Sequence, residues 1–425
     1  MKQINRLNGR MIAAGLAAAM VLGACGGEED PEAQPADAEA TTEGSSDTED
    51  PEGRAGESLE SYTFGVIIEE TGNASVFGEP TNHGWQVALE ELNEQSEVSF
   101  SVETCDGASD PQQAITCYER LVDRDGVDAV VGPTISASVI ALDPMVREDE
   151  RLLYYLGGGY GERDMGGNPY MFGANTTTED VLATIFAWGA AQGYTDTYMI
   201  STADATGQDC REFVSEPQYE ERRVLELIGQ DEMAIDAQSA APQMANVPTE
   251  ADMVILCATG GAGVVMAAGF EQAGLEMPAV ALHSQGLPAI EKAMEGAVSD
   301  GKVYVAGFCP LAAAKDELPD GFACTEATMA FTERLQQMFP DAEPTFISAA
   351  TYDALTQIGA AVREVGADTD AIVNWFESQE ALAGANGIYD YGPDQHRGMG
   401  LESVIMGVYR DGGFHLESML NMPKA

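Results

Sequence analysis

Short apolar runs alternate with amphipathic segments along most of this chain. The runs near 62–68 and 128–131 are rich in β-branched and aromatic residues and are short enough for buried strands. Between them, segment 83–92 places its large apolar side chains at the spacing of one helical face: Trp85, Ala88, Leu89 and Leu92. Repeated strand–helix units predict an α/β fold whose parallel sheets are covered by helices on both faces. Because about 365 residues is long for one open sheet, we expect two Rossmann-like lobes.

The same alternation continues almost to the end of the sequence. Further strands are expected near 98–104, 152–156, 197–201, 253–257, 279–282 and 303–308. Asp110-Pro111 is a typical helix start, with Asp as N-cap and Pro in the first turn. Other helices are expected near 136–145, 179–192, 208–228, 262–273, 287–295, 324–338 and 346–365. Segments 403–409 and 413–416 flank Asp411-Gly412 and predict an antiparallel pair.

The charge balance excludes some classes of function. The chain carries 20 Lys and Arg against 71 Asp and Glu, a formal net charge of −51, which excludes a general nucleic-acid binder. An anionic bilayer would repel this surface, so any membrane attachment must be covalent or hydrophobic. Only four His occur and none are paired at ligand spacing, which argues against a His-based metal site. A surface or packing role is favoured for each His, except that His283 follows a strand expected to end at a cleft.

The sequence contains no motif of a cofactor site or an enzyme active site. The glycines of 257–263 look like a dinucleotide-binding loop, but the spacing requires Gly at position 266, which is Met266. Neither a GxxxxGK[ST] nor a GxSxG motif occurs. We therefore expect no cofactor, no metal and no enzymatic activity.

The N-terminus has the pattern of an export signal. Residues 1–24 combine a basic start with a short apolar segment, too short to span a bilayer but typical of a signal peptide. Leu22-Gly23-Ala24-Cys25 resembles a bacterial lipobox, in which Cys25 receives the lipid. The alternative is an ordinary secretory signal with an incidental Cys. Residues 25–60 are acidic and poor in large apolar residues, which predicts a disordered tether; a Ca²⁺-binding tail is the alternative.

Six cysteines remain besides Cys25: Cys105, Cys117, Cys210, Cys257, Cys309 and Cys324. An even number in an exported protein implies disulfides, although six cysteines allow 15 pairings. The simplest pairing joins neighbours along the chain. Catalytic or metal-binding thiols are the alternative, but the sequence has no CxxC motif.

Three stretches carry a resemblance to a known family: FGVIIEETGNASVFGEPTNHGWQVALEELN, DPQQAITCYERLVDRDGVDAVVGPTISASVIALDPMV and TYDALTQIGAAV. With them, residues 61–425 resemble the type I periplasmic substrate-binding proteins of the leucine/isoleucine/valine-binding family. The resemblance implies two lobes, 61–175 with 310–388 and 176–309 with 389–425, joined by crossovers near 172–178, 306–310 and 386–396. It implies a monomer that traps a small solute between its lobes and delivers it to an ABC permease at the outer face of the cell membrane.

Ligand sites in open parallel sheets lie beyond the carboxyl ends of the strands, here 69–78, 132–137, 157–160, 202–208, 258–262 and 283–287. By the resemblance, Phe77 covers the ligand's side chain and Ser136 holds a ligand carboxylate, helped by backbone N–H groups at a helix N-terminus. Gly157 and Gly159 match a loop that offers a carbonyl and a hydroxyl, and Gln285 takes the place of an acid that binds the ligand's ammonium. The remaining candidates in these loops are Ala137, Gly158, Thr206 and Gly260.

Two departures from the family pattern bear on the ligand. Gly159 has no hydroxyl and Gln285 has no charge, whereas a buried ammonium usually needs a carboxylate partner. An amide, urea-like or carboxylate solute therefore fits at least as well as a branched-chain amino acid. An aromatic or apolar ligand framed by aromatic residues is a further alternative: Tyr154, Tyr155, Tyr160 and Phe308. A ligand-sensing receptor is the competing function, and an enzyme on the same scaffold is a third.

Overall fold

The computed structural model describes residues 59–157, 167–313, 317–411 and 413–419. The expected signal peptide, Cys25 and nearly all of the expected tether lie outside these residues, and so do Gly158, Gly159 and Tyr160. In the described part of the chain, no helix has both the length and the apolar character needed to cross a membrane.

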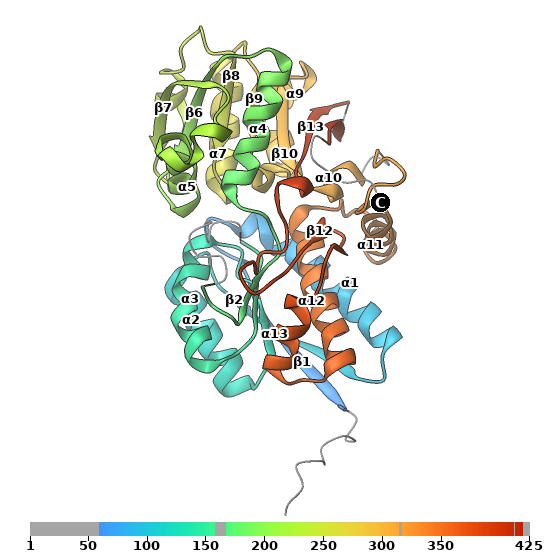
Figure 1. The fold of residues 1–425 in the computed structure, drawn as a ribbon. Helices are drawn as coiled ribbons and strands as arrows, with labels where there is room; N and C mark the ends of the chain where they lie inside the picture. The colour runs from blue at the N-terminus through green and yellow to red at the C-terminus, as the bar shows by residue number, and fades with distance from the viewer. Residues whose placement is uncertain (1–58, 158–166, 314–316, 412, 420–425) are drawn as a thin grey trace, which may run out of the picture. The chain divides into compact units, whose positions relative to one another are not determined.

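The first sheet has five parallel strands in the order β2-β1-β3-β4-β5 (Figure 1). Their bounds are β1 (Ser61–Ile68), β2 (Ser99–Asp106), β3 (Ala129–Val131), β4 (Leu153–Tyr155) and β5 (Met171–Gly173). Strand β1 is central, and Phe64 lies opposite both Val102 and Ala129. Alternate residues of β1 pack in two different hydrophobic cores, one on each face of the sheet: Val66 and Ile68 lie in one core, and Ile67 lies in the other. Burial on both faces explains why β1 is a continuous apolar run.

Helices cover both faces of this sheet. One face carries a pair that packs together, α2 (Pro111–Glu119) and α3 (Ser136–Asp149), and the other carries α1 (Gly78–Gln95) against α12 (Phe346–Val365) (Figure 1). The helix α13 (Thr369–Glu377) packs on α12. Asp110 caps α2 as the sequence predicts, since its carboxylate accepts a hydrogen bond from the Gln113 N–H at 2.9 Å.

The second sheet has seven strands in the order β14-β13-β10-β9-β8-β6-β7. They are β6 (Asp196–Thr202), β7 (Glu226–Met233), β8 (Met253–Cys257), β9 (Ala279–Ala281), β10 (Val303–Gly307), β13 (Ile405–Arg410) and β14 (Gly413–Ser418). All pairs are parallel except those of β13, which confirms the expected antiparallel pair at the end of the chain. The associated helices are α4 (Thr178–Gln192), α5 (Ala205–Ser215), α6 (Ala241–Met244), α7 (Gly260–Ala273), α8 (Pro288–Ala293) and α9 (Glu295–Ser299).

The chain passes between the two sheets three times. It leaves the first sheet after β5, returns after β10 through α10 (Cys309–Ala313) and α11 (Thr325–Met338), and leaves again after β12 (Ile388–Tyr389), which pairs with β11 (Leu382–Ala383). The first and third passages are bonded together, because the Asn386 amide donates to Ala174 O at 3.1 Å and Asn175 Oδ1 at 2.8 Å. Asp353 of α12 in turn holds the segment around Asn386, accepting from its backbone N–H at 2.8 Å.

One expected element is wrong. The helix expected near 208–228 ends at Ser215, where Pro217 opens the short helix η4 (Pro217–Arg222), and β7 follows at the sheet edge. An edge strand buries little, so β7 carries acids and lacks the apolar run that marks a central strand. The sequence interpretation also missed β5, α10 and α13.

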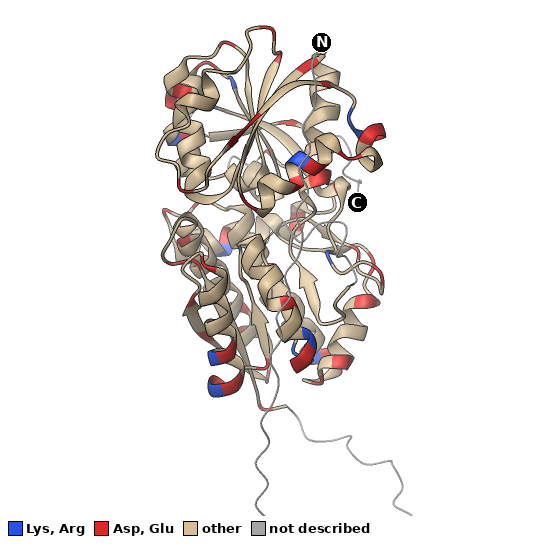
Figure 2. Ribbon diagram, turned by 90° about the vertical axis from the view of Figure 1, so that its left-hand side faces the viewer, with Lys and Arg blue, Asp and Glu red and all other residues tan. Residues whose placement is uncertain are grey.

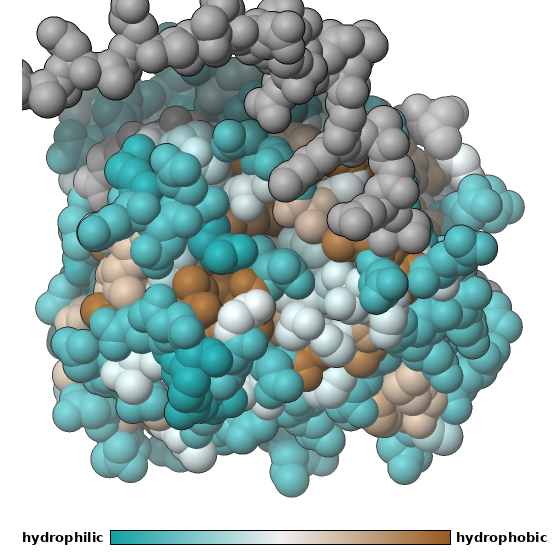
Figure 3. All heavy atoms as spheres, turned by 90° about the horizontal axis from the view of Figure 1, so that it is seen from below, coloured by the Kyte–Doolittle hydropathy of each residue, from teal (hydrophilic) through white to brown (hydrophobic). Residues whose placement is uncertain are grey.

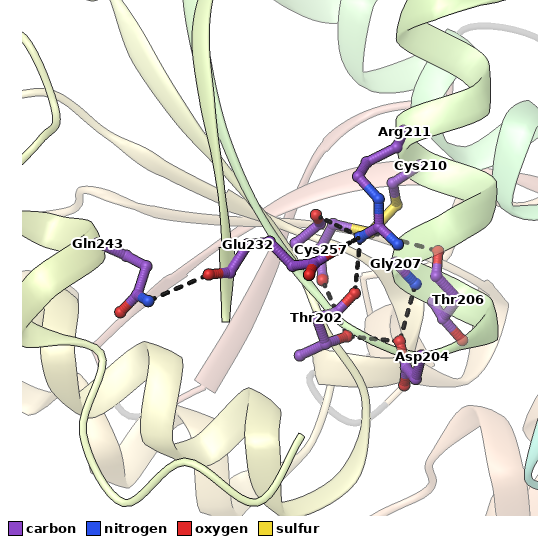
Figure 4. A network of polar contacts seen from close by, with 10 residues as sticks. Thr202, Asp204, Thr206, Gly207, Cys210, Arg211, Glu232, Gln243 and Cys257 are labelled. Carbon is purple, nitrogen blue, oxygen red and sulfur yellow. Dashed lines mark hydrogen bonds and ion pairs between the residues drawn. A yellow bond between two sulfur atoms is a disulfide. The ribbon is translucent and has the colours of Figure 1, made fainter. Parts of the chain in front are cut away.

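The structure forms three disulfides, Cys105–Cys117, Cys210–Cys257 and Cys309–Cys324. This is the pairing of neighbours along the chain. Each bridge joins two elements of secondary structure or their ends, as Cys210 of α5 joins the end of β8 (Figure 4).

Acidic residues dominate the charged positions of the described surface. Figure 2 shows Asp and Glu on helices and loops around both sheets, with few Lys and Arg among them. The part of the face in Figure 3 that grey atoms do not cover is mostly hydrophilic at its rim, with small groups of hydrophobic residues nearer the middle.

Candidate ligand site between the lobes

A cavity of about 190 Å³ is lined by residues from both lobes. Each strand-end loop that the sequence predicts to face a ligand contributes to its wall: Phe77, Ser136, Gly157, Thr206, Thr259 and His283. The carboxyl ends of parallel strands gather at one edge of a sheet, which explains why segments far apart in the sequence meet here.

The predicted ligand residues divide into three groups. Phe77, Ser136, Ala137, Gly157 and Thr206 line the cavity. Gly158 and Gly159 lie outside the described residues. Gly260 and Gln285 are described but are not part of the wall. The wall also includes residues that the sequence interpretation missed: Ser109, Pro111, Thr178, Ile235, Phe346 and Ile347.

The N-terminus of α3 offers hydrogen-bond donors to the cavity. Its N-cap is Ile135, whose apolar side chain cannot accept a hydrogen bond from the first turn. Ser136 follows with its side chain in the cavity wall and only 6% of its surface exposed. The backbone of Gly157 lies close to that of Thr134, because a Cβ at position 157 would lie 2.7 Å from Thr134 O. Uncapped N–H groups beside a hydroxyl suit an anionic or carbonyl oxygen.

Three aromatic rings from both lobes meet at the cavity. Phe77 and Phe346 pack edge to face, with ring centroids 5.9 Å apart, and the His283 ring of the second lobe lies 5.2 Å from Phe346. Phe346 begins α12, which a capping box between Thr345 and Ser348 fixes in place. That capping pattern is visible in the sequence and could have marked the position of Phe346. The rings supply apolar contact area for the carbon skeleton of a ligand.

The wall of the second lobe is held by polar contacts (Figure 4). Asp204 caps α5, accepting from the Gly207 N–H at 2.9 Å and from the Thr202 hydroxyl at 2.7 Å. Arg211 donates to Thr202 O at 2.8 Å and pairs with Glu232 at 3.1 Å. A Cβ at Gly207 would lie 1.7 Å from Thr202 O, so only glycine permits this turn. These contacts fix the loop that carries Thr206.

Gln285 does not reach the cavity, contrary to the expectation. Its side chain is fully buried beneath α7, with Nε2 3.5 Å from Gly263 O. Residues 283–285 form the one-turn helix η5 (His283–Gln285), which points successive side chains in different directions. His283 and Ser284 therefore line the cavity in place of Gln285.

Gly260 lies where a loop of the second lobe meets the first lobe. Its φ is +56°, and a Cβ there would lie 3.0 Å from Asn73 O. The next N–H, that of Gly261, donates to Asn73 O at 2.6 Å. This contact links the two lobes directly.

Burial shifts the pKa of two groups at the site. It lowers the pKa of His283 to about 3, with the charge of Arg397 as a second cause, so the imidazole is neutral at pH 7. Burial also raises the pKa of Glu69 to about 7, although the carboxylate accepts from the Thr134 N–H at 3.3 Å. Glu69 thus supports the loop that leads to Ser136. The described residues contain no cluster of three or more His, Cys, Asp or Glu that could hold a metal ion.

Hydroxyls, helix N–H groups and aromatic rings are the means by which proteins bind small organic solutes. Leu/Ile/Val-binding protein BraC3 of Rhizobium johnstonii is 29% identical over 94 residues, 21% of this chain and 25% of that protein. The matched region thus spans about a quarter of the length of that curated relative.

Solved structures extend the similarity to the whole described fold. An extracellular ligand-binding receptor from Rhodopseudomonas palustris has a TM-score of 0.76 at 15% identity, over 85% of this chain and 100% of the receptor. A solute-binding protein of an ABC transporter from R. palustris, in complex with benzoate, has a TM-score of 0.72 at 15% identity, over 86% and 98% of the two chains.

The profile of the family described as periplasmic binding protein matches residues 61–409. The match includes the first sheet, the second sheet up to β13 and all three passages between them, and the α/β fold with two lobes agrees with the solved structures. The chain therefore belongs to the periplasmic binding protein family, with the type I fold.

Proposed function

We propose that this protein is a lipid-anchored, extracytoplasmic solute receptor for an ABC importer. The observation that carries the proposal is the cavity, whose wall is built from both lobes. Family membership and the lipobox-like sequence at Cys25 support it. The proposed partners are a small solute and the permease subunits in the membrane, with the protein acting as a monomer.

Binding works through closure of the lobes. A solute that contacts Ser136 in one lobe and Thr206 in the other gains both sets of contacts only in the closed state, so it shifts the population toward closure. In this proposal, bending is confined to the three passages between the sheets, and the lobes are 61–175 with 310–388 and 176–309 with 389–425. The closed form then presents a surface to the permease.

The solute is a small organic molecule with an apolar part and at least one oxygen acceptor. The aromatic rings of Phe77 and Phe346 receive the apolar part, and Ser136 with the N-terminus of α3 receives the oxygen. The relative named as a Leu/Ile/Val-binding protein and the neighbour that holds benzoate support this class. A sensory receptor of the same fold remains the second candidate, and permease genes beside the gene would favour transport.

Ser136→Ala tests the site. Losing a hydrogen bond to a charged or strongly polar group of the ligand should weaken affinity by about ten- to a hundredfold. The measurement is titration calorimetry with the solute that mass spectrometry identifies after release from denatured protein. Ser138→Ala is the matched control, because this buried serine of the same helix does not line the cavity. Unchanged affinity in Ser136→Ala would show that the site is assigned wrongly.

Cys25→Ser tests the anchor. Without the thiol, no diacylglycerol can be attached, so the variant should leave the membrane fraction and appear in soluble form. Fractionation and mass spectrometry of the N-terminal peptide provide the measurement. A variant that stays entirely with the membrane would rule out anchoring through Cys25.

A further inference from the structure

His283 carries a buried imidazole in the wall of the cavity, without a hydrogen-bond partner. The second lobe contributes this residue to the wall, and only 5% of its surface is exposed. Its imidazole forms no hydrogen bond with any described residue. Buried polar side chains are normally hydrogen-bonded, and an unbonded one in the wall of a cavity is available to a ligand.

Neighbouring groups hold this ring in place. Its centroid lies 5.0 Å from that of Phe308 and 5.2 Å from that of Phe346, whose ring is nearly perpendicular to it. The one-turn helix η5 is closed by the Gly286 N–H, which donates to His283 O at 2.9 Å. Packing and the backbone therefore fix the ring, and its nitrogens remain available for a solute.

The two ring nitrogens have different surroundings. Nδ1 is fully buried and has no partner among the described residues. Nε2 has no partner among them either but is not fully buried, which makes it the nitrogen that a solute in the cavity can reach. Burial, followed by the charge of Arg397, lowers the pKa of His283 to about 3, so the neutral ring carries one proton at pH 7. A buried N–H without an acceptor is rarer than a buried acceptor without a donor. On this ground the proton is placed on Nε2, and the imidazole presents an N–H donor to the cavity.

Hydrogen-bond donors thus face the cavity from both lobes. In the first lobe they are the Ser136 hydroxyl and the uncapped N–H groups of α3, and in the second lobe His283 adds another. Asp204 is the one acid in the described wall, and its Oδ1 already accepts from the Gly207 N–H at 2.9 Å and the Thr202 hydroxyl at 2.7 Å. Oxygen acceptors of a solute match such a wall, whereas an ammonium can only donate and finds no partner in these donors.

We propose that His283 donates a hydrogen bond from Nε2 to an oxygen of the solute, and that the solute is an acid whose second polar group is an oxygen acceptor instead of an ammonium. A 2-oxo acid belongs to this class. Its carboxylate binds at Ser136 and the N-terminus of α3, and its oxo oxygen binds at His283. Its carbon chain packs on Phe77 and Phe346. The inference rests on the proposed function and narrows it to acids that lack an amino group.

The first test uses the unmodified protein, so it does not depend on a variant that folds. Titration calorimetry compares three compounds that share one carbon skeleton: 4-methyl-2-oxopentanoate, L-leucine and 4-methylpentanoate. The oxo acid should bind at least about tenfold more tightly than either of the others. It alone offers an acceptor to the imidazole, and the ammonium of L-leucine would be buried without a partner.

Each other outcome of this test decides against the inference or is decided by the natural solute. If L-leucine binds as tightly as the oxo acid, its ammonium has a partner such as Asp204, and the inference is overturned while a solute receptor remains. Equal binding of 4-methylpentanoate also overturns it, because the oxo oxygen then gains nothing from His283. If none of the three compounds binds, mass spectrometry of the solute released from denatured protein decides. An acid with a second oxygen group and no amine supports the inference, and any other solute overturns it. If no solute is released either, the proposed function fails together with the inference.

The second test, His283→Phe, separates binding from packing. Phenylalanine keeps a ring against Phe308 and Phe346 but has no donor, so the preference for the oxo acid over 4-methylpentanoate should fall close to one. His283→Gln retains an N–H donor and should retain part of this preference. His83→Phe is the control, because His83 stacks on Phe339 with ring centroids 4.2 Å apart and does not line the cavity. If His283 acts only in packing, His283→Phe changes the binding of both acids equally, and that unchanged preference overturns the proposal.

Discussion

Asp353→Ala is expected to lower the free energy of unfolding by about 3–5 kcal/mol. Asp353 is buried in α12 and accepts three hydrogen bonds: from the N–H of Ala385 at 2.7 Å, the N–H of Asn386 at 2.8 Å and the hydroxyl of Tyr389 at 2.9 Å. Alanine would leave these donors unpaired in the interior, next to the segment that ties two of the interlobe passages together. Denaturant unfolding followed by circular dichroism measures the loss.

The matched control is Asp368→Ala. Asp368 also accepts a backbone hydrogen bond, from the Ala371 N–H at 3.0 Å, but it is exposed at the start of α13. Its loss should cost about 1 kcal/mol, as is usual for a helix cap. Equal effects of the two substitutions would contradict the role given to Asp353.

The charge of Asp353 adds a dependence on pH. Burial raises its pKa from 3.8 to about 6, so the folded state binds the proton more tightly than the unfolded state. The stability that this group contributes is fully present below pH 4 and is lost as the pH rises through 6. The Asp353→Asn variant has no titrating carboxyl at this position. Its free energy of unfolding should therefore fall less between pH 4 and pH 6 than that of the unmodified protein.

The second large effect is expected when the disulfide between Cys210 and Cys257 is removed. It closes the longest of the three loops, with a separation of 47 residues, against 12 for Cys105 and Cys117. By loop entropy, Cys210→Ala with Cys257→Ala should cost about 4 kcal/mol and Cys105→Ala with Cys117→Ala about 3 kcal/mol. For a domain of this size, the larger loss corresponds to a melting temperature lower by on the order of 5 °C.

Scanning calorimetry of both double variants, under non-oxidising and oxidising conditions, measures these losses. A reducing agent should lower the melting temperature of the unmodified protein. In each double variant, any further drop in melting temperature caused by the reducing agent should come only from the disulfides that remain. If the variant without Cys210 and Cys257 has the same melting temperature as the unmodified protein, this disulfide does not form in solution.

Much of the fold could be predicted because it depends on local signals. The buried run at 62–68 lies within β1 (Ser61–Ile68), and the Asp110-Pro111 start of α2 is found where the cap and the proline place it. The loops around the cavity could also be predicted, since one rule about the carboxyl ends of parallel strands covers them all. Strand β7 was missed because an edge strand needs no apolar run.

The detailed wall of the cavity depends on orientation, which local patterns do not carry. Gln285 and His283 are two residues apart, yet one packs beneath α7 and the other faces the cavity. Phe346 comes from a helix that begins more than 250 residues after Phe77, and the two rings meet only in the folded chain. Arg397 stands in a segment with no motif, and nothing near it in the sequence shows that its guanidinium is buried without an acid.

The sequence by itself determined the α/β class, the order of most elements, the pairing of neighbouring cysteines as the simplest choice and the resemblance to a solute-binding family. These follow from periodicity, caps and spacing, which act over a few residues. Only the tertiary structure decided which side chains line the cavity and which arginine is fully buried. Burial and pairing are properties of groups brought together from distant parts of the chain, and Arg397, Thr176 and His283 become neighbours only when three such parts fold against one another.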